Sequence, residues 1–427
     1  MVELKIIKII KNKTFIRLVD CLPTRPVYMV EDHDDKRFGT KAVHSGTNPV
    51  GGGVNTPVFL SSTYHLTDDR YAGWAAGAQH TLLYSRLSSV NSEAVAAKIT
   101  SLEGAEDAEV FASGMAAIST TLLGILSSGD HIIASPDVYG GTYGLLTEEL
   151  PRFGIEVTMA DIQDPSSYES AIKDNTKMIY VETLTNPVLK VCDLEAMANL
   201  AKKHNLISVV DNTFASPWGC NPIKYGFDLV IHSGTKYLGG HSDLIAGLVA
   251  GKRDLIAHIF PKKVHFGGAA DPHMCYLLER GMRTLHVRMP THTSNAEELA
   301  KRLANHHMIE CVHHTSLPGN NFELAKKILP KGSGMLAYVV KGGDTAALEY
   351  MRTLKLSLEA TSLGGVESLV ECPFNSSHMF VPDQIRQESG VVPGFARMSV
   401  GIEDVEDLWD DIETALKVVE NLLIAKA

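Results

Sequence analysis

Apolar and polar residues alternate along the middle of the chain in blocks that predict strands and helices in turn. Short runs rich in Val and Ile, such as "ISVV" at 207–210, are typical of strands buried on both faces, as in a parallel sheet covered by helices. Strands are predicted at 107–113, 131–136, 155–161, 176–183, 206–212 and 228–233, and helices at 92–104, 114–130, 139–154 and 193–205. This strand–helix alternation predicts an α/β domain with three layers, α/β/α.

The pattern changes after about residue 285. The remaining blocks predict a helix at 291–307, strands at 333–342 and 354–362, and a closing helix at 405–427. They indicate a smaller C-terminal α+β domain at 286–427, packed against an α/β domain at 96–285.

The first residues of the chain, 1–37, differ from everything that follows. "MVELKIIKIIKNKTFIRLVD" mixes lysines with isoleucines, without the continuous apolar core of a signal peptide or the Ser/Arg richness of a transit peptide. We interpret residues 1–37 as an extension of unassigned role and expect a cytoplasmic protein.

Composition narrows the possible partners. The 427 residues are 44% hydrophobic and 21% charged, with a net charge of −11 and no long basic run, which argues against a nucleic-acid partner. No apolar run approaches the roughly 20 residues that span a bilayer, so no membrane partner is expected. The six cysteines form no CxxC pair, and the histidines of "NHHMIE" and "VHHTS" lack metal-ligand spacing, so we expect neither disulfides nor a bound metal.

Polar clusters follow several of the predicted strands. Ser113-Gly114-Met115, Asp211-Asn212-Thr213 and Ser233 to Lys236 all come where an apolar run ends. Ligands of open α/β sheets bind beyond the carboxyl ends of the strands, so these clusters mark a candidate site. Taken alone, each cluster also fits an ordinary turn or helix cap.

The chemistry of the clusters points to one cofactor. Small residues at a helix start form a phosphate cradle, and a carboxylate at Asp211 needs a cation, such as a protonated ring nitrogen, to be buried. Lys236 offers an amine for a Schiff base, with Ser233 and Thr235 beside it to bind phosphate. Together they describe pyridoxal phosphate (PLP). The rival, a dinucleotide site, lacks a GxGxxG after the early strands.

At this point the sequence resembles a known family. From about residue 38 onward it is similar to the Cys/Met-metabolism family of PLP enzymes, which includes cystathionine γ-lyase, γ-synthase and β-lyase, methionine γ-lyase and O-acylhomoserine sulfhydrylase. The matching stretches are "YSR", "FASGMAA", "DVYGGTY", "VETLTNP", "VVDNTFASP", "SGTKYLGGHSD", "RGMRTLHVRM", "SLGGVESL" and "RMSVGIEDVEDL". The resemblance implies the PLP-dependent transferase fold type I and a homotetramer of dimers that share active sites. Residues 38–95 would be an arm that contacts the neighbouring subunit.

The resemblance also implies roles for individual residues. Lys236 would hold the cofactor and act as the base, and Tyr139 would stack on the ring and protonate the leaving sulfur. Asp211 would keep the ring nitrogen protonated, and Arg397 would bind the substrate carboxylate. The remaining implied contacts are to the cofactor, from Ser113, Gly114, Met115, Thr213, Ser233, Thr235 and the neighbouring subunit's Tyr84 and Arg86, and to the substrate, from Asn186 and Ser362.

The chain departs from the family pattern in four ways. After "YSR" the chain reads Leu87-Ser88-Ser89-Val90-Asn91 instead of a Gly-Asn-Pro-Thr turn, and the segment "HTSLPGNNFELAK" replaces a family loop over the substrate channel. Leu83 and Thr361 stand where cystathionine-using relatives often carry glutamates that bind the distal ammonium. Gly141 stands where methionine γ-lyases typically have a cysteine.

We therefore expect a PLP-dependent C–S lyase of transsulfuration and of cysteine and methionine metabolism, acting on a small sulfur amino acid. The leading hypothesis is γ-elimination of L-cystathionine to a thiol, 2-oxobutyrate and ammonia. The alternatives are a cystathionine β-lyase, a γ-synthase or O-acylhomoserine transferase, and a methionine γ-lyase. A non-enzymatic protein of the same fold is a further alternative, against which the intact set Lys236, Asp211, Tyr139 and Arg397 argues.

Overall fold

The computed structural model describes residues 33, 35–50, 53–75, 81–319, 322–379 and 381–426. Residues 1–32 and 34, which hold most of the extension and Cys21, lie outside the described residues. The other five cysteines are free. Among the helices that the structure describes, none has the length and apolar content that crossing a bilayer requires.

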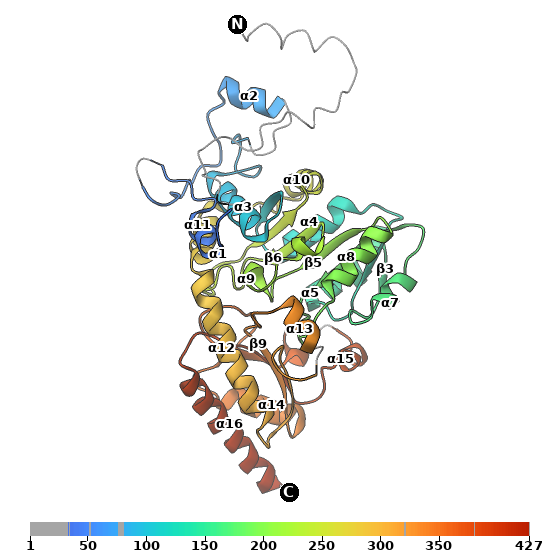
Figure 1. Cartoon of the computed structure of the whole chain (residues 1–427), viewed down its shortest axis with the longest axis vertical. Coiled ribbons are helices and arrows are strands. Elements are labelled where there is room, and N and C mark those ends of the chain that lie inside the picture. The colour runs from blue at the N-terminus through green and yellow to red at the C-terminus, as the bar shows by residue number, and fades with distance from the viewer. Residues whose placement is uncertain are drawn as a thin grey trace.

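A seven-stranded sheet forms the centre of the larger part of the molecule (Figure 1). Its order is β1-β7-β6-β5-β4-β2-β3, and the strands span Asp107–Phe111 (β1), His131–Ala134 (β2), Glu156–Met159 (β3), Thr176–Glu182 (β4), Ile207–Asp211 (β5), Leu229–Ser233 (β6) and Gly247–Gly251 (β7). All six strands predicted for this domain are present. One strand departs from the parallel arrangement, because β7 lies antiparallel between β1 and β6.

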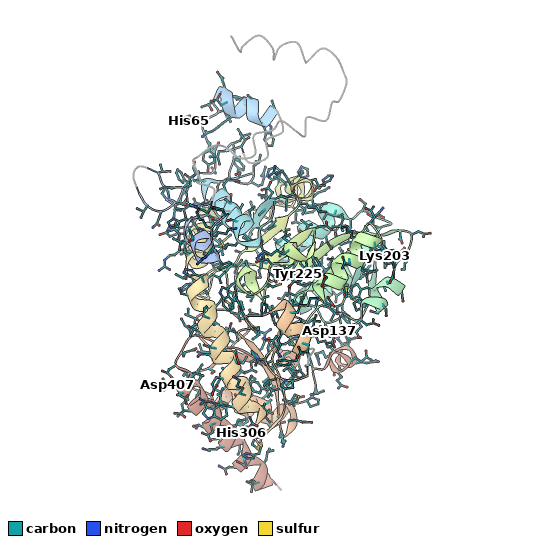
Figure 2. All side chains as sticks on the ribbon, viewed as in Figure 1. His65, Asp137, Lys203, Tyr225, His306 and Asp407 are labelled. Carbon is teal, nitrogen blue, oxygen red and sulfur yellow. The ribbon has the colours of Figure 1, made fainter. Side chains whose placement is uncertain are left out.

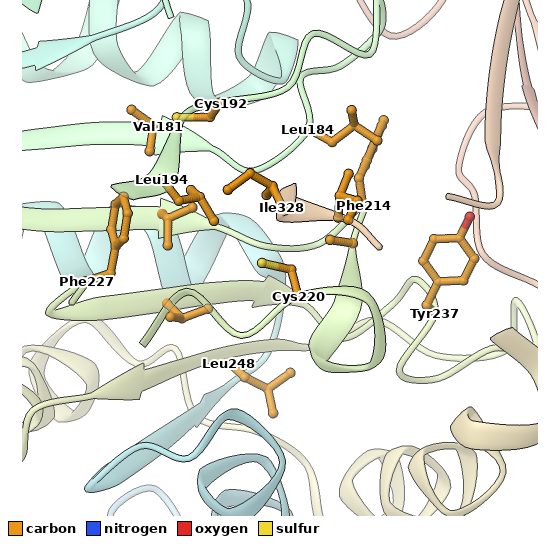
Figure 3. Packing of buried hydrophobic residues seen from close by; sticks show 14 of the residues in the cluster. Val181, Leu184, Cys192, Leu194, Phe214, Cys220, Phe227, Tyr237, Leu248 and Ile328 are labelled. Atoms are coloured by element: carbon orange, nitrogen blue, oxygen red, sulfur yellow. The ribbon is translucent and has the colours of Figure 1, made fainter. Parts of the chain in front are cut away.

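Helices cover both faces of this sheet and give the predicted three layers. On one face the buried core includes residues of α3 (Val90–Glu103), α8 (Leu194–Lys203) and α11 (Pro272–Arg283), and Figure 3 shows part of this packing, with Val181 and Leu248 of the sheet and Leu194 of α8. On the other face α4 (Gly114–Ile125) and α10 (Arg253–Phe266) pack on the strand residues that alternate with these. Buried side chains on both faces explain the continuous Val/Ile runs of the strands.

The remaining links between these strands are short helices and turns. After β2 the chain forms α5 (Gly140–Gly144), the π-helical η1 (Leu145–Glu149) and α6 (Leu150–Arg152). Further on come α7 (Pro165–Ser170), α9 (Ser216–Gly219) and the 3-10 helix η2 (Pro222–Tyr225). The predicted helix end at Gly104 is confirmed, since this residue is a left-handed C-cap with φ +71°.

A second, five-stranded sheet builds the smaller part, in the order β10-β11-β12-β9-β8. Its strands are Ile309–His313 (β8), Met335–Val340 (β9), Leu358–Glu359 (β10), Leu369–Glu371 (β11) and Phe395–Ser399 (β12), and its helices are α13 (Phe322–Ile328), α14 (Gly343–Thr353), η3 (Pro373–Asn375), α15 (Asp383–Ser389) and α16 (Val405–Lys426). The strand predicted at 354–362 is largely wrong, since only Leu358 and Glu359 pair. Helix α12 (Leu285–Ala304) begins beside the predicted boundary and runs along this sheet (Figure 1).

We use the term arm for the described residues 35–50, 53–75 and 81–89, which precede α3. Helix α1 (Phe38–His44) packs against α3 and α11, whereas α2 (Asp68–Ala75) has no buried residue and projects from the body (Figure 1). The unusual segment Leu87–Asn91 is buried, and its last two residues already belong to α3. The Asn91 side chain forms hydrogen bonds with the arm: it donates to Pro57 O and accepts from Phe59 N. This segment therefore anchors the arm.

Candidate active site

Three polar side chains end neighbouring parallel strands at one edge of the large sheet. Glu182 closes β4, Asp211 closes β5 and Ser233 closes β6, and Glu182 is paired in register with Asp211. Because these strands run in the same direction, their carboxyl ends meet at one edge and bring the clusters together. The loop after β2 reaches the same region: Asp137, labelled in Figure 2, precedes Tyr139 and forms an ion pair of 2.9 Å with Lys190.

The predicted phosphate cradle lies at the start of α4. Ser113 caps this helix by accepting from Ala116 N at 3.1 Å, so its hydroxyl is used locally. A Cβ added to Gly114 would come within 3.0 Å of Ser233 Cβ and 3.1 Å of its Oγ, so the helix start and Ser233 face one another across a space that only glycine leaves open. The Thr235 hydroxyl accepts from Ala246 N at 3.0 Å. Gly114, Met115 and Ser233 therefore fit a phosphate.

Asp211 is held beside this cradle. One of its oxygens accepts from Thr213 N at 2.9 Å, and Thr213 Oγ1 accepts from Ser233 N at 2.8 Å, which ties β5 to β6. Burial raises the pKa of the Asp211 carboxyl, so a cation facing it would favour its charged form. A protonated pyridine nitrogen fits this requirement.

Lys236 lies in a turn after β6 and points to the smaller sheet's side of the site. Its Nζ donates to Ser362 Oγ at 2.7 Å. Burial, with a smaller contribution from Arg397, lowers the pKa of Lys236 from 10.5 to about 8. Ser362 itself has φ +88°, an unfavourable backbone conformation for a non-glycine residue and typical of functional sites.

Tyr139 precedes α5, and its ring is partly exposed. Its backbone N donates to Glu182 Oε1 at 2.8 Å. A Cβ at Gly141 would lie 2.6 Å from Tyr139 Cε1 and 3.2 Å from Met115 Sδ, so the ring lies over Gly141. The glycine that departs from the methionine γ-lyase pattern thus determines where this ring can lie.

Arg397 lies in β12, almost fully buried. Its Nη1 donates to Asn186 Oδ1 at 2.7 Å, and its Nη2 donates to Ser362 O at 2.9 Å. Ser362 thus joins the predicted base to the predicted carboxylate-binding residue, since its hydroxyl contacts Lys236 and its carbonyl contacts Arg397.

Tyr84 and Arg86 are not part of this connected group. Both are exposed, and the Arg86 guanidinium lies 5.2 Å from the Tyr84 ring centroid. Their predicted place in a neighbouring subunit's site stays a prediction.

Three residues of the site were not assigned from the sequence. Glu182 binds the backbone N of both Tyr139 and Asn186, the second at 3.2 Å. Glu371, in β11, forms a 2.7 Å ion pair with Arg397, and His378 Nε2 lies 3.0 Å from Asn186 O. Glu182 could have been assigned from the sequence, because it ends the apolar run "MIYV" as Asp211 ends "ISVV".

A cavity of about 820 Å³ adjoins these residues. Thr235, Thr361 and Ser362 lie in its wall, together with Asp243, Asp271 and Glu367. It is large enough for an amino acid. Thr361 therefore lines this cavity beside Ser362.

Comparison with known proteins identifies the family. Residues 39–417 match the Cys/Met metabolism PLP-dependent enzyme family. The chain belongs to this family. Among curated relatives, the cystathionine gamma-lyase of Bacillus subtilis is 40% identical over 88% of this chain and 98% of its own, and the L-methionine gamma-lyase of Porphyromonas gingivalis is 38% identical over 90% and 98%. The cystathionine beta-lyase of Lactococcus lactis is 38% identical over 88% and 98%.

Comparison with solved structures supports the same family. The crystal structure of cystathionine gamma-lyase from Lactobacillus plantarum, complexed with L-serine, matches with a TM-score of 0.85 and 36% identity over 90% of this chain and 99% of that one. The predicted fold type I is therefore confirmed, as are PLP as the cofactor and a carbon–sulfur lyase of sulfur amino acid metabolism as the enzyme class. The relatives carry three different activities at similar identity, so the family alone does not choose among them.

Proposed function

We propose that this PLP-dependent lyase removes the thiol from the γ-carbon of L-cystathionine and gives cysteine, 2-oxobutyrate and ammonia. One observation carries the proposal: Ser362 joins Lys236, through its hydroxyl at 2.7 Å, to Arg397, through its carbonyl at 2.9 Å. A substrate whose carboxylate binds Arg397 would place its Cα proton next to the lysine amine.

The residues of the chain divide the work as follows. PLP would be held by Gly114, Met115, Ser233, Asp211 and Lys236, and when bound it would supply an electron sink for the carbons next to the substrate amine. Arg397, with Asn186 and Ser362, would bind the α-carboxylate in a fixed direction.

Proton transfers would fall to Lys236 and Tyr139. The lysine amine, with its pKa lowered to about 8, would accept the proton from Cα, give it up to the electron sink that PLP supplies, and then, neutral again, accept one from Cβ. The Tyr139 hydroxyl, on a ring placed over Gly141, donates a proton to the sulfur as the Cγ–S bond breaks. Water then completes hydrolysis to the oxo acid and ammonia.

A methionine γ-lyase is the second candidate, because Leu83 and Thr361 are neutral and Thr361 lies in the wall of the cavity. Neutral residues at these two positions suit the methyl thioether of methionine better than a distal ammonium group. Against this candidate, a cysteine at position 141 would bring a Cβ to 2.6 Å from the Tyr139 ring, so this site is shaped around glycine.

The products distinguish these activities. The purified holoenzyme is incubated separately with L-cystathionine and with L-methionine, and the products are identified by mass spectrometry. Cysteine with 2-oxobutyrate from cystathionine supports the proposal, and a faster release of methanethiol from methionine favours the second candidate. Homocysteine with pyruvate would instead indicate a β-lyase and overturn it.

We further propose that the active site is completed by a second copy of the chain, within a cytoplasmic homotetramer. The arm exposes large apolar side chains, among them Val54, Leu60, Leu66, Tyr71 and Trp74, which favours burial against a partner. Tyr84 and Arg86 lie at the base of this arm, and both side chains are exposed.

Subunit mixing tests this assembly. Lys236→Ala and Arg86→Ala are each expected to be nearly inactive, but a dimer with one subunit of each kind would contain one intact site. Equal mixing, with exchange of subunits, is then expected to restore about a quarter of the wild-type activity. No recovery from a mixture that light scattering shows to have exchanged subunits would refute the shared site.

A further inference from the structure

The predicted binding residue for the substrate carboxylate already faces a carboxylate of its own chain. Arg397 Nη2 lies 2.7 Å from Glu371 Oε1, and each of the two side chains is only 3% exposed. The residues are opposite one another on the antiparallel strands β11 and β12, so the backbone pairing itself brings the charges together.

In this ion pair neither side chain uses its full hydrogen-bonding capacity. The closest contact joins one oxygen to one nitrogen, and Glu371 Oε2 and Arg397 Nε have no hydrogen-bond partner among the described residues. Arginine and carboxylate normally pair through two parallel contacts, which are the stronger arrangement. A buried pair that leaves a donor and an acceptor unused is easier to separate than a two-pronged one.

The geometry leaves no free edge for a second carboxylate. A guanidinium presents two edges to a two-pronged carboxylate, Nη1 with Nη2 and Nε with Nη2, and both include Nη2. Nη2 already contacts Glu371 and donates to Ser362 O at 2.9 Å. The carbonyl is part of the backbone that also positions the hydroxyl for Lys236, so the side chain of Glu371 is the group that can give way.

We propose that Glu371 is an internal counter-anion that occupies Arg397 until the substrate carboxylate displaces it. This role rests on the proposed function of Arg397, and it makes Glu371 a positioning residue whose charge sets how tightly a substrate carboxylate binds.

The Glu371 carboxylate has a second hydrogen-bond partner besides Arg397. Ser377 Oγ donates to Glu371 Oε1 at 2.7 Å, and His378 Nδ1 lies 3.0 Å from the same hydroxyl. An unpaired buried carboxylate is costly, so this hydroxyl lowers the cost of separating Glu371 from Arg397. Ser377 therefore favours substrate binding without contacting the substrate.

The test measures binding of butanoate, a carboxylate without an amino group, to the holoenzyme by calorimetry, together with KM and kcat for cystathionine. Glu371→Gln keeps the shape and removes the competing charge, so butanoate is expected to bind about five- to tenfold more tightly, with KM falling in parallel and kcat changing less. Ser377→Ala is expected to weaken butanoate binding several-fold, because Glu371 loses its alternative partner.

Glu109→Gln is the matched control. Glu109 forms a buried ion pair with Lys263 in which both side chains are 4% exposed, outside the carboxylate site, and butanoate affinity should not change. Unchanged or weaker binding in Glu371→Gln would overturn the proposal, because a merely structural glutamate would produce that result. If this variant does not fold, unchanged binding in Ser377→Ala overturns it instead.

A separate variant tests the assumption about Arg397. Arg397→Ala should lose butanoate binding while it keeps the visible absorption band of enzyme-bound PLP. Wild-type affinity in Arg397→Ala would show that the carboxylate binds elsewhere, which removes both the assigned role of Arg397 and the proposal for Glu371. A result confined to Glu371→Gln would leave the role of Arg397 intact.

Discussion

The amine of Lys236 should react with PLP at a pH where an ordinary lysine is inert. Its pKa falls from 10.5 to about 8, because burial disfavours the ammonium form and the charge of Arg397 adds to that effect. Reactivity of the amine therefore increases with pH: below the pKa it is protonated and unreactive, and above the pKa it is neutral and nucleophilic. Uptake of PLP by the apoenzyme should therefore accelerate as pH rises through about 8 and then level off.

The size of the effect follows from the two pKa values. At a pH of about 7.5, an amine with a pKa of 8 is neutral in about a quarter of the molecules, whereas one with a pKa of 10.5 is neutral in about 0.1%. Burial thus increases the reactive fraction by roughly 200-fold.

The assay mixes apoenzyme with excess PLP across a pH series and records the growth of the absorption band of the enzyme-bound cofactor. Glu371→Gln should shift the midpoint to lower pH, because the charge of Glu371 raises the pKa of Lys236. A rate that keeps rising to a pH of about 10 in the wild type would show that the surroundings of Lys236 do not lower its pKa. Lys236→Ala is the control that should form no such band.

Two further variants test the cofactor site. Gly114→Ala is expected to reduce PLP affinity at least about tenfold, because its Cβ would fill the space 3.0 Å from Ser233. Gly124→Ala in the same helix, where the new Cβ would make ordinary contacts at 3.5 Å, should leave PLP affinity unchanged. Equal affinities in PLP titrations of the two apoenzymes would contradict this. Glu182→Ala is expected to lower the free energy of unfolding by about 1–3 kcal/mol, since the backbone N–H of Tyr139 loses its buried acceptor, and to lower kcat at least about tenfold. Urea denaturation and steady-state kinetics measure both effects, and an unchanged kcat would show that Glu182 does not position Tyr139.

The large domain was predictable because its signals are local. Continuous apolar runs marked β4, β5 and β6, and the polar residue ending each run marked the ligand-binding edge, since parallel strands place their carboxyl ends together. Strand β7 was missed because its sequence, "GLVAG", is short and glycine-rich, and its antiparallel pairing with β1 and β6 is a property of the assembled sheet.

The contacts across the site could not be predicted in the same way. Arg397 and Glu371 meet because β11 and β12 pair in antiparallel register, and β11 is only three residues long, too short for a recognisable pattern. Lys236 and Ser362 are separated by 126 positions and meet only because the larger and smaller parts of the molecule share a core. Resemblance to the family pointed to Arg397 and Ser362, but only the fold reveals that Arg397 is already paired.

The most direct test of the central claim is the identity of the products that purified holoenzyme forms from L-cystathionine, compared with Lys236→Ala under the same conditions. We expect cysteine and 2-oxobutyrate in equal amounts from the wild type and neither from the variant. Homocysteine with pyruvate, or the same products from Lys236→Ala, would contradict it.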